Sequence, residues 1–300
     1  MAKRLVVIVP AYNEEEILEQ TIGALRSIDD ALRQLDIAMH ICLIDDGSTD
    51  STRSVAQRCD IDHIIGHKVN QGLGAAVRSG IEYARVEGFD FLVKFDADLQ
   101  HDPNDIPALL KPLSDDQADV VYGNRFPHIA YRMPWMRRWG NWLFTRLMRA
   151  LTGWPVQDSQ PGIFAVNQDY LAQADVPSDY NYTQMVLLDA YLKNMRFTQV
   201  DVHFRKRVSG QSFVSLRYPF KVIPQILLLV ASAKPMSIFA PIGLTFLLVG
   251  GTVFGVQFVM WLLGETPKPV VNVNLVLGSL LFGLQTLFFG ILAELIVRKK

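Results

Sequence analysis

Two aspartates separated by one residue are the part of this sequence best suited to chemistry. Asp96 and Asp98 directly follow residues 91–95, an apolar run typical of a buried strand, and Gln100 adds a further side-chain oxygen. Mg²⁺ and Mn²⁺ prefer oxygen ligands and commonly keep phosphate oxygens among them. The spacing therefore predicts a divalent cation held between the carboxylates and a diphosphate. A solvated acidic loop is the alternative, and for an isolated Asp-x-Asp it is the better interpretation.

The segments around these aspartates alternate between strand and helix patterns. Short apolar runs predict four strands, at residues 5–9, 41–44, 61–65 and 91–95. Helical spacing of apolar residues predicts helices between them, from Glu14 onward, over 49–58, and from about Leu73. This alternation predicts an α/β domain with a mostly parallel sheet.

Polar side chains gather where three of the predicted strands end. They are Tyr12, Asn13 and Glu14 after the first strand, Asp45 and Asp46 after the second, and residues 96–100 after the fourth. Ligands of parallel α/β sheets bind outside the carboxyl ends of the strands. The three clusters should therefore converge, which favours the cation site over the acidic loop.

The glycine pattern argues against two other nucleotide-binding classes. Gly72 and Gly74 are followed by Val77, where a dinucleotide fingerprint would need its third glycine. No segment matches the phosphate loop of P-loop NTPases. These glycines are better explained by a turn and close helix packing. The net charge of −1 also argues against general nucleic-acid binding.

Five segments in order, VPAYNEE, DDGSTDST, NQGLGAAVRSGIEYA, DADLQHDP and YGNRF, resemble the inverting family 2 glycosyltransferases. Within that family the chain is most similar to dolichol-phosphate mannose synthases and bacterial polyprenyl-phosphate glycosyltransferases, over about residues 4–215. The resemblance implies a GT-A fold, a nucleotide-sugar donor, and Mg²⁺ or Mn²⁺ on Asp96, Asp98 and Gln100. The implied binding residues for the sugar donor are Pro10, Tyr12, Asn13, Glu14, Asp46, Asp96, Ala97, Asp98 and Gln100.

The acceptor side departs from the family pattern at two positions. Residues 158–162 match the family's D-x-x-x-G, but Ile163 and Phe164 follow in place of a segment with an arginine. Residues 207–212 match R-x-x-G-x-S, but Phe213 replaces a lysine. Both changes lie where an acceptor phosphate is expected.

The predicted chemistry depends on that acceptor. A lipid phosphate is already anionic and needs only positioning by cations such as Arg207 and Arg125. The predicted acceptor-phosphate residues are Arg125, Arg205, Arg207 and Ser212. A hydroxyl acceptor would need a carboxylate base, for which Asp158 is the candidate, although a structural loop acid is an equal alternative. The predicted catalytic residues are Asp98, Arg207 and Asp158.

Two long uncharged segments predict membrane-spanning helices. No Asp, Glu, Lys or Arg lies between Lys234 and Glu265 or between Lys268 and Glu294, and each run exceeds the ~20 residues that a span requires. Basic residues lie before the first run and after the second, which predicts a cytoplasmic large domain and C-terminus. Cys42 and Cys59 should then be reduced thiols.

Two further segments combine basic and aromatic residues. Residues 131–153 hold five arginines, three tryptophans and no acid, which is typical of a helix at a membrane surface. Residues 216–234 have a similar character, interrupted by Pro219 and Pro224. The predicted domains are a glycosyltransferase domain at 1–215, an interfacial segment at 216–234, and a two-helix anchor at 235–300.

The predicted function is transfer of a sugar to polyprenyl or dolichyl phosphate at the cytoplasmic membrane face, with inversion. GDP-mannose is favoured over UDP-glucose as the sugar donor, because DADLQHDP resembles the mannose-transferring members. Two alternatives remain open: a glycosyltransferase acting on a glycolipid or another hydroxyl acceptor, and an inactive subunit that binds nucleotide sugars. A homo-oligomer is likewise an open alternative to a monomer.

Overall fold

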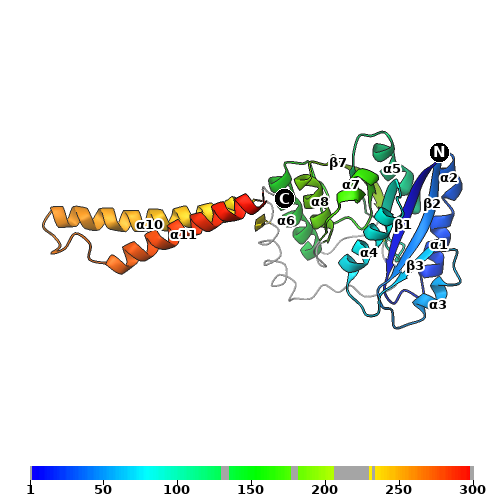
Figure 1. Cartoon of the computed structure of the whole chain (residues 1–300), viewed down its shortest axis with the longest axis horizontal. Coiled ribbons are helices and arrows are strands. Elements are labelled where there is room, and N and C mark those ends of the chain that lie inside the picture. The colour runs from blue at the N-terminus through cyan, green and yellow to red at the C-terminus, as the bar shows by residue number, and fades with distance from the viewer. Residues whose placement is uncertain (1, 130–134, 177–181, 206–229, 232–233, 298–300) are drawn as a thin grey trace. The chain divides into compact units, whose positions relative to one another are not determined.

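The computed structural model describes residues 2–129, 135–176, 182–205, 230–231 and 234–297 (Figure 1). The chain divides into two compact units, Met1–Ser212 and Phe213–Lys300. Most of the predicted interfacial segment at 216–234 lies outside the described residues, so it stays a prediction.

The first unit is built on one seven-stranded sheet in the order β3-β2-β1-β4-β6-β5-β7. Its strands are β1 Lys3–Ala11, β2 Ile37–Asp45, β3 His63–Gly66, β4 Phe91–Lys94, β5 Val120–Ile129, β6 Phe164–Asn167 and β7 Phe197–Phe204. Only β6 runs antiparallel to its neighbours, β4 and β5, among the described strand pairs. The predicted α/β class and mostly parallel sheet are confirmed.

Helices of the first unit cover both faces of the sheet (Figure 1). They are α1 Leu18–Arg26, α2 Asp29–Arg33, α3 Thr52–Ala56, α4 Leu73–Val86, α5 Ile106–Ser114, α6 Trp135–Thr152, α7 Gln168–Gln173 and α8 Tyr182–Leu192, with a short 3₁₀ helix η1 at Pro103–Asp105. Two predicted helices begin later than expected. The reason is that the loops after β1 and β2 bond to each other: Thr49 N–H donates to Asn13 Oδ1, and Ser51 N–H to Glu15 Oε2.

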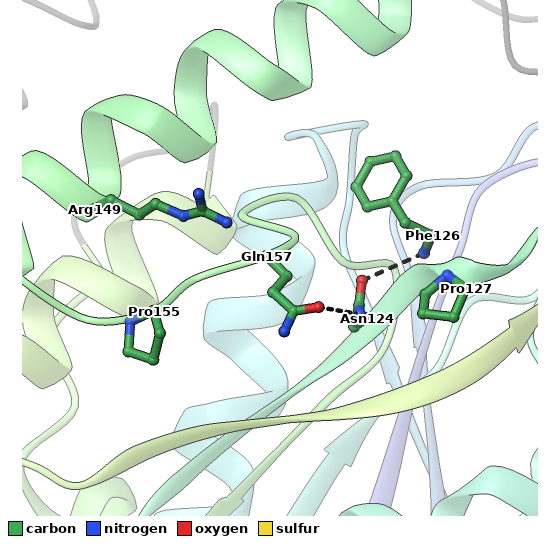
Figure 2. A pocket seen from close by; sticks show the side chains of 6 residues that line it. All are labelled: Asn124, Phe126, Pro127, Arg149, Pro155 and Gln157. Carbon is green, nitrogen blue, oxygen red and sulfur yellow. Dashed lines mark hydrogen bonds between the residues drawn. The ribbon is translucent and has the colours of Figure 1, made fainter.

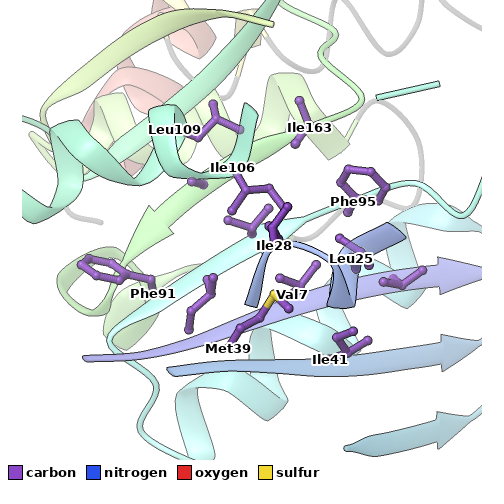
Figure 3. Packing of buried hydrophobic residues seen from close by; sticks show 14 of the residues in the cluster. Val7, Leu25, Ile28, Met39, Ile41, Phe91, Phe95, Ile106, Leu109 and Ile163 are labelled. Carbon is purple, nitrogen blue, oxygen red and sulfur yellow. The ribbon is translucent and has the colours of Figure 1, made fainter. Parts of the chain in front are cut away.

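The core explains why the first strands read as continuous apolar runs. Val7 of β1, Leu25 of α1, and Ile106 and Leu109 of α5 belong to one buried hydrophobic cluster (Figure 3). On the other face, a Cβ on Gly80 of α4 would lie 2.8 Å from Ile8 Cδ1, so that helix rests directly on β1. Strands buried on both faces have no polar side to alternate with.

The second unit consists of two long apolar helices, α10 Met236–Leu262 and α11 Val273–Val297. They pack closely through glycine, since a Cβ on Gly243 would lie 2.7 Å from Leu287 Cγ. Gln257 Oε1 accepts hydrogen bonds from the N–H groups of Val271 and Asn272, at 2.6 and 2.9 Å, and so closes the hairpin. Both helices are long and apolar enough to cross a membrane, and only 17% and 11% of their most apolar windows are buried.

Candidate active site

The strand order brings the predicted polar clusters together. In the sheet β1 lies between β2 and β4, and Ala11 pairs with Asp45 while Ile8 pairs with Lys94. The carboxyl ends of these three parallel strands therefore share one edge. Tyr12, Asp46 and Asp98 follow directly from that edge, as expected from the sequence.

Asp46 ties the loop after β3 to the end of β2. Its carboxylate accepts hydrogen bonds from Gln71 N–H at 2.9 Å and Gly72 N–H at 2.7 Å, and His67 Nδ1 lies 2.6 Å from Oδ1. Gly47, just after it, has φ +71, and a Cβ there would lie 2.5 Å from the backbone carbon of Val69. The DDGS and NQGLG segments therefore form one preorganised structure, and Asp46 is buried within it.

The residues after β1 differ in how accessible they are. Tyr12 is 42% exposed, so its ring is available to a ligand at the sheet edge. Pro10 is buried within β1, opposite Ile44. Asn13 has φ 54 and fixes the β2 loop, because its N–H donates to Ser48 Oγ at 3.1 Å. Glu14 N–H donates to Thr52 Oγ1 at 2.8 Å.

The segment after β4 presents the predicted metal ligands. Asp98 is 8% exposed, and its Oδ1 accepts a hydrogen bond from Gln100 N–H at 3.1 Å. Gln100 Nε2 donates to the Arg205 carbonyl at 3.2 Å, which leaves the amide Oε1 as the Gln100 side-chain atom suited to a cation. Ala97 has its side chain in the core, and its carbonyl accepts from Thr21 Oγ1 at 2.6 Å.

Asp96 is held by a residue that the sequence did not single out. The Lys94 ammonium is fully buried, forms an ion pair with Asp96 Oδ1, and donates to the Gly162 carbonyl at 2.7 Å. Burial alone would lower the pKa of Lys94, but Asp96 and then Tyr182 outweigh it and raise that pKa above its ordinary value. A lysine within an apolar strand was the available signal, because a buried charge has to be paired.

Gly162 lies against the Asp96 carboxylate. A Cβ on Gly162 would clash with His101 Nε2 and would lie 2.7 Å from Asp96 Oδ2, so only glycine fits. His101 is 1% exposed, and neither of its ring nitrogens has a hydrogen-bond partner among the described residues. Burial lowers the pKa of His101 to about 3, which keeps the ring neutral. His101 is the second site residue that sequence reasoning missed.

The Asp158 carboxylate is fully buried and paired with Arg125. Arg125 Nε and Nη2 lie 2.7 and 3.1 Å from its two oxygens, and Asn141 Nδ2 and Gln160 N–H donate to Oδ1 at 3.1 and 3.0 Å. The Arg125 guanidinium also lies 5.1 Å from the centre of the Phe204 ring. This geometry favours a positioning role for Asp158 over that of a base reaching an acceptor.

The remaining predicted acceptor residues are only partly described. Arg205 forms an ion pair with Asp102, and its N–H donates to the Gln100 carbonyl at 2.7 Å. Arg207 and Ser212 lie outside the described residues, so their roles stay predictions.

A pocket of about 630 Å³ lies along the end of β5, between Asn124 and Arg149 (Figure 2). Asn124 and Arg149 lie on opposite sides of it, and Gln157 lies between them. Asn124 Nδ2 donates to Gln157 Oε1 at 2.8 Å and to Asp201 Oδ1 at 2.7 Å, which fixes this wall. The pocket therefore combines fixed amide groups with one arginine.

The residues at the sheet edge fit a divalent cation that is bound partly by their oxygen atoms and partly by those of a diphosphate. Asp96, Asp98 and Gln100 offer the oxygen atoms that Mg²⁺ and Mn²⁺ prefer. Within the described parts of the chain, no three His, Cys, Asp or Glu side chains converge as a metal cage. Water and phosphate oxygens would therefore have to complete the shell.

Most of the first unit is similar in sequence to known proteins. Residues 6–174 match the family model described as glycosyl transferase family 2. The chain belongs to that family. This family 2 glycosyltransferase is 30% identical to the undecaprenyl-phosphate mannosyltransferase of Micrococcus luteus, over 71% of this chain and 88% of the relative. It is also 30% identical to the UDP-N-acetylglucosamine–dolichyl-phosphate N-acetylglucosaminyltransferase of Methanococcus voltae, over 57% of this chain and 72% of the relative.

Solved structures confirm the GT-A fold of this glycosyltransferase. Glucosyl-3-phosphoglycerate synthase from Mycobacterium tuberculosis, in complex with Mn²⁺, UDP and glucosyl-3-phosphoglycerate, superposes with a TM-score of 0.59. The match covers 77% of this chain and 80% of that structure, at 20% identity. The same enzyme has also been solved with Mg²⁺ and UDP.

Proposed function

We propose that this glycosyltransferase transfers a sugar from a nucleotide sugar to a polyprenyl phosphate, at the cytoplasmic face of a membrane and with inversion. The observation that carries the proposal is the similarity to enzymes named for undecaprenyl phosphate and dolichyl phosphate, the first over 88% of its length. The pair of long apolar helices supports it, because a lipid acceptor has to be met at a membrane.

The sugar donor we propose is GDP-mannose, ahead of UDP-glucose. The relative from Micrococcus luteus and the polyprenol monophosphomannose synthase of Mycolicibacterium smegmatis are both named for mannose, whereas the one from Methanococcus voltae is named for N-acetylglucosamine. At the sheet edge, the exposed Tyr12 ring offers a surface on which a base can stack.

Mg²⁺ or Mn²⁺ on Asp98 and Gln100, with Asp96 beside them, is the cofactor we propose. When bound, such a cation supplies positive charge opposite the departing diphosphate. Asp98 Oδ1 accepts a hydrogen bond from Gln100 N–H, which helps to orient its carboxylate. Tyr12, Asp46 and the loops that Asp46 joins would orient the nucleotide, so that the anomeric carbon faces the acceptor.

The acceptor phosphate would be positioned by cations and would need no base. Arg125 pairs with Asp158, and its guanidinium lies over the ring of Phe204, the last residue of β7. In the sequence, Arg207 follows that strand. A hydroxyl acceptor would instead need Asp158 as base, but that carboxylate is fully buried and its oxygens are already bonded to Arg125, Asn141 and Gln160. The geometry therefore favours the phosphate.

Helix α6 supports a location at a membrane surface. Phe144 and Met148 face the domain and are buried, whereas Trp139 and Trp142 are more than half exposed. Arg146 lies 5.7 Å from the Trp142 ring. Such a face suits lipid headgroups.

If α10 and α11 both span the membrane, cysteines introduced at Thr266 and Lys300 should be labelled from opposite sides of sealed vesicles. Labelling of both from one side would contradict two spans.

The proposed function is tested by transfer to defined acceptors. The full chain in lipid vesicles should convert undecaprenyl phosphate and GDP-mannose, with Mn²⁺, into a lipid-linked sugar detected by mass spectrometry. UDP-glucose and UDP-N-acetylglucosamine, used in parallel, identify the sugar donor. The dephosphorylated polyprenol is the matched control acceptor and should stay unmodified. Transfer to the polyprenol or to a glycolipid, but not to the phosphate, would overturn the proposal.

A further inference from the structure

The starting observation is a histidine that connects two strands to a helix. His67 directly follows β3, and its backbone N–H donates to the Asp45 carbonyl of β2 at 2.8 Å. Its ring Nδ1 lies 2.6 Å from Asp46 Oδ1, and its Nε2 lies 2.9 Å from Ser79 Oγ on α4. The side chains of His67 and Asp46 are only 9% and 5% exposed. His67 therefore joins the end of β2 to α4 from a buried position.

The chemistry of the two partners determines how the imidazole ring is oriented. An ionised carboxylate can only accept, so His67 Nδ1 carries the hydrogen that is donated to Asp46. Nε2 then faces the Ser79 hydroxyl, which is able to donate or to accept. Ser79 lies on a helix that is pressed against the sheet, because a Cβ on the neighbouring Gly80 would lie 2.8 Å from Ile8 Cδ1. The ring is thus held from both sides.

Asp46 passes this orientation on to the loop formed by residues 67–72. Besides His67, its carboxylate accepts hydrogen bonds from Gln71 N–H at 2.9 Å and from Gly72 N–H at 2.7 Å. A carboxylate has about four acceptor positions, and these three donors occupy most of them. Asp46 consequently organises its own surroundings and keeps little capacity to bind a ligand directly.

The 67–72 loop depends on these hydrogen bonds, because few of its side chains pack into the domain. Its exposed side chains are those of Lys68, Val69, Asn70 and Gln71. The loop follows the carboxyl end of β3, at the edge where ligands of parallel sheets bind. A segment with so little buried apolar surface opens easily once its hydrogen bonds are removed.

We propose that His67 is a positioning residue for the nucleotide, which holds the 67–72 loop through Asp46 in its binding conformation before the sugar donor arrives. This inference rests on the proposed function for the identity of the ligand, a nucleoside diphosphate sugar. Without His67 the nucleotide would have to order the loop as it binds, and its affinity would fall by that cost. Both ring nitrogens of His67 are engaged within the protein, so the rate of the bound complex should stay nearly unchanged.

Two substitutions of His67 separate its two contacts. The side-chain amide of asparagine reaches the position of Nδ1, and that of glutamine reaches the position of Nε2. His67→Gln therefore loses the bond to Asp46, and it should weaken GDP binding by about 10- to 100-fold, as expected for a hydrogen bond to a charged group. His67→Asn keeps that bond and loses only Ser79, so it should weaken GDP binding by about 2- to 10-fold. Ser79→Ala should match His67→Asn.

The measurement is calorimetry of GDP with the full chain in detergent, with UDP as the alternative nucleotide. Steady-state transfer should show the same order of effects in the KM of the sugar donor, with kcat nearly constant. A larger loss in His67→Asn than in His67→Gln would overturn the inference. Wild-type affinity in Ser79→Ala would overturn it too, whether or not the His67 variants fold.

A double-variant cycle tests whether His67 acts through Asp46. Asp46→Asn should weaken GDP binding by itself, and adding His67→Gln should cause little further loss, because the interaction between the two side chains is already removed. Additive losses would show that His67 acts independently of Asp46, which would contradict the inference.

His203→Gln is the matched control. His203 Nδ1 also lies against an aspartate, Asp105 Oδ1 at 2.9 Å, but on β7, at the opposite edge of the sheet from β3. This control should leave GDP binding unchanged.

A purely structural role of His67 predicts a different result. His67→Gln would then unfold at a lower temperature without nucleotide, while the folded protein would bind GDP as tightly as the wild type. That outcome would overturn the inference. Failure of the wild type to bind either nucleotide would instead contradict the proposed function.

Discussion

The two halves of the glycosyltransferase domain anchor their carboxylates at the functional edge in different ways. In the first half, residues 3–100, Asp45, Asp46 and Asp98 accept hydrogen bonds from backbone N–H groups. In the second half, residues 101–205, Asp102 and Asp158 are paired with arginines. Asp96, paired with Lys94, lies where the halves meet.

The difference matches the charges that each half is proposed to meet. A carboxylate held by neutral N–H groups keeps its negative charge and can attract a cation. A carboxylate paired with arginine is neutralised, so it repels an approaching phosphate less, and the arginine can still donate hydrogen bonds. This difference is consistent with the proposal that a metal binds at the first half and an anionic acceptor at the second.

Asp98→Asn should have the largest effect, because it removes the charge that the first half directs at the cation. We expect transfer to fall by about 100-fold or more, the loss typical when a key electrostatic group is removed from a transition state. Fold and membrane association should persist, as checked by circular dichroism and flotation. Asp96→Asn should chiefly weaken binding of the sugar donor and the response to metal. Near-normal turnover of Asp98→Asn at saturating Mn²⁺ would contradict the metal assignment.

Arg125→Ala tests the paired carboxylates of the second half. Asp158 would be left buried and uncompensated, so the free energy of unfolding should fall by about 3–5 kcal/mol, as measured by urea denaturation in detergent. If Asp158 only positions Arg125, the losses of transfer in Arg125→Ala, Asp158→Asn and the double variant should be similar. A further loss in the double variant would favour a separate role for Asp158 as a base.

Arg207→Ala tests whether the cationic character of the second half extends past β7. We expect about a 10- to 100-fold loss of transfer to polyprenyl phosphate, in line with the loss of a charged hydrogen bond. Arg207→Lys should recover only part of it, because lysine lacks the planar fork. Calorimetry of the nucleotide sugar without lipid should change much less. An equal loss in that assay would move Arg207 to the diphosphate.

Arg196→Ala should have the smallest effect on activity, since its pair with Asp119 precedes β5 at the opposite end of that strand. Hydrogen bonds from Arg196 lower the pKa of Asp119. Because the pKa of Asp119 is lower in the folded state, its ion pair stabilises the fold when the pH is above the unfolded pKa of about 3.9. This stabilisation is lost as the pH falls through the lower pKa of the folded state. The variant should therefore be less stable than the wild type at pH 7 in thermal unfolding, and this difference should shrink as the pH is lowered below about 3.9. If the variant and the wild type transferred sugar at different rates at pH 7, the Arg196–Asp119 pair would have to influence the active site.

Much of the first half could be predicted from the sequence, because its structure is local. Parallel strands buried on both faces are continuous apolar runs, and each polar cluster directly follows its strand. The sequence therefore predicted correctly that Asp46 and Asp98 come after buried strands, and their binding roles stay predictions. The two long apolar helices followed from an uncharged run alone.

Only the tertiary structure decided which charges meet. Arg125 and Asp158 are 33 residues apart, and Lys94 reaches Gly162 across 68. Both contacts depend on β6 returning antiparallel between β4 and β5, a pairing that no local pattern indicates. Hydrophobic burial determines each strand from its own residues. The partner of a buried charge depends instead on the order of the strands within the sheet. The sequence therefore determined the fold class and the segment predicted to bind a metal, and the structure determined that Asp96 pairs with Lys94 and Asp158 with Arg125.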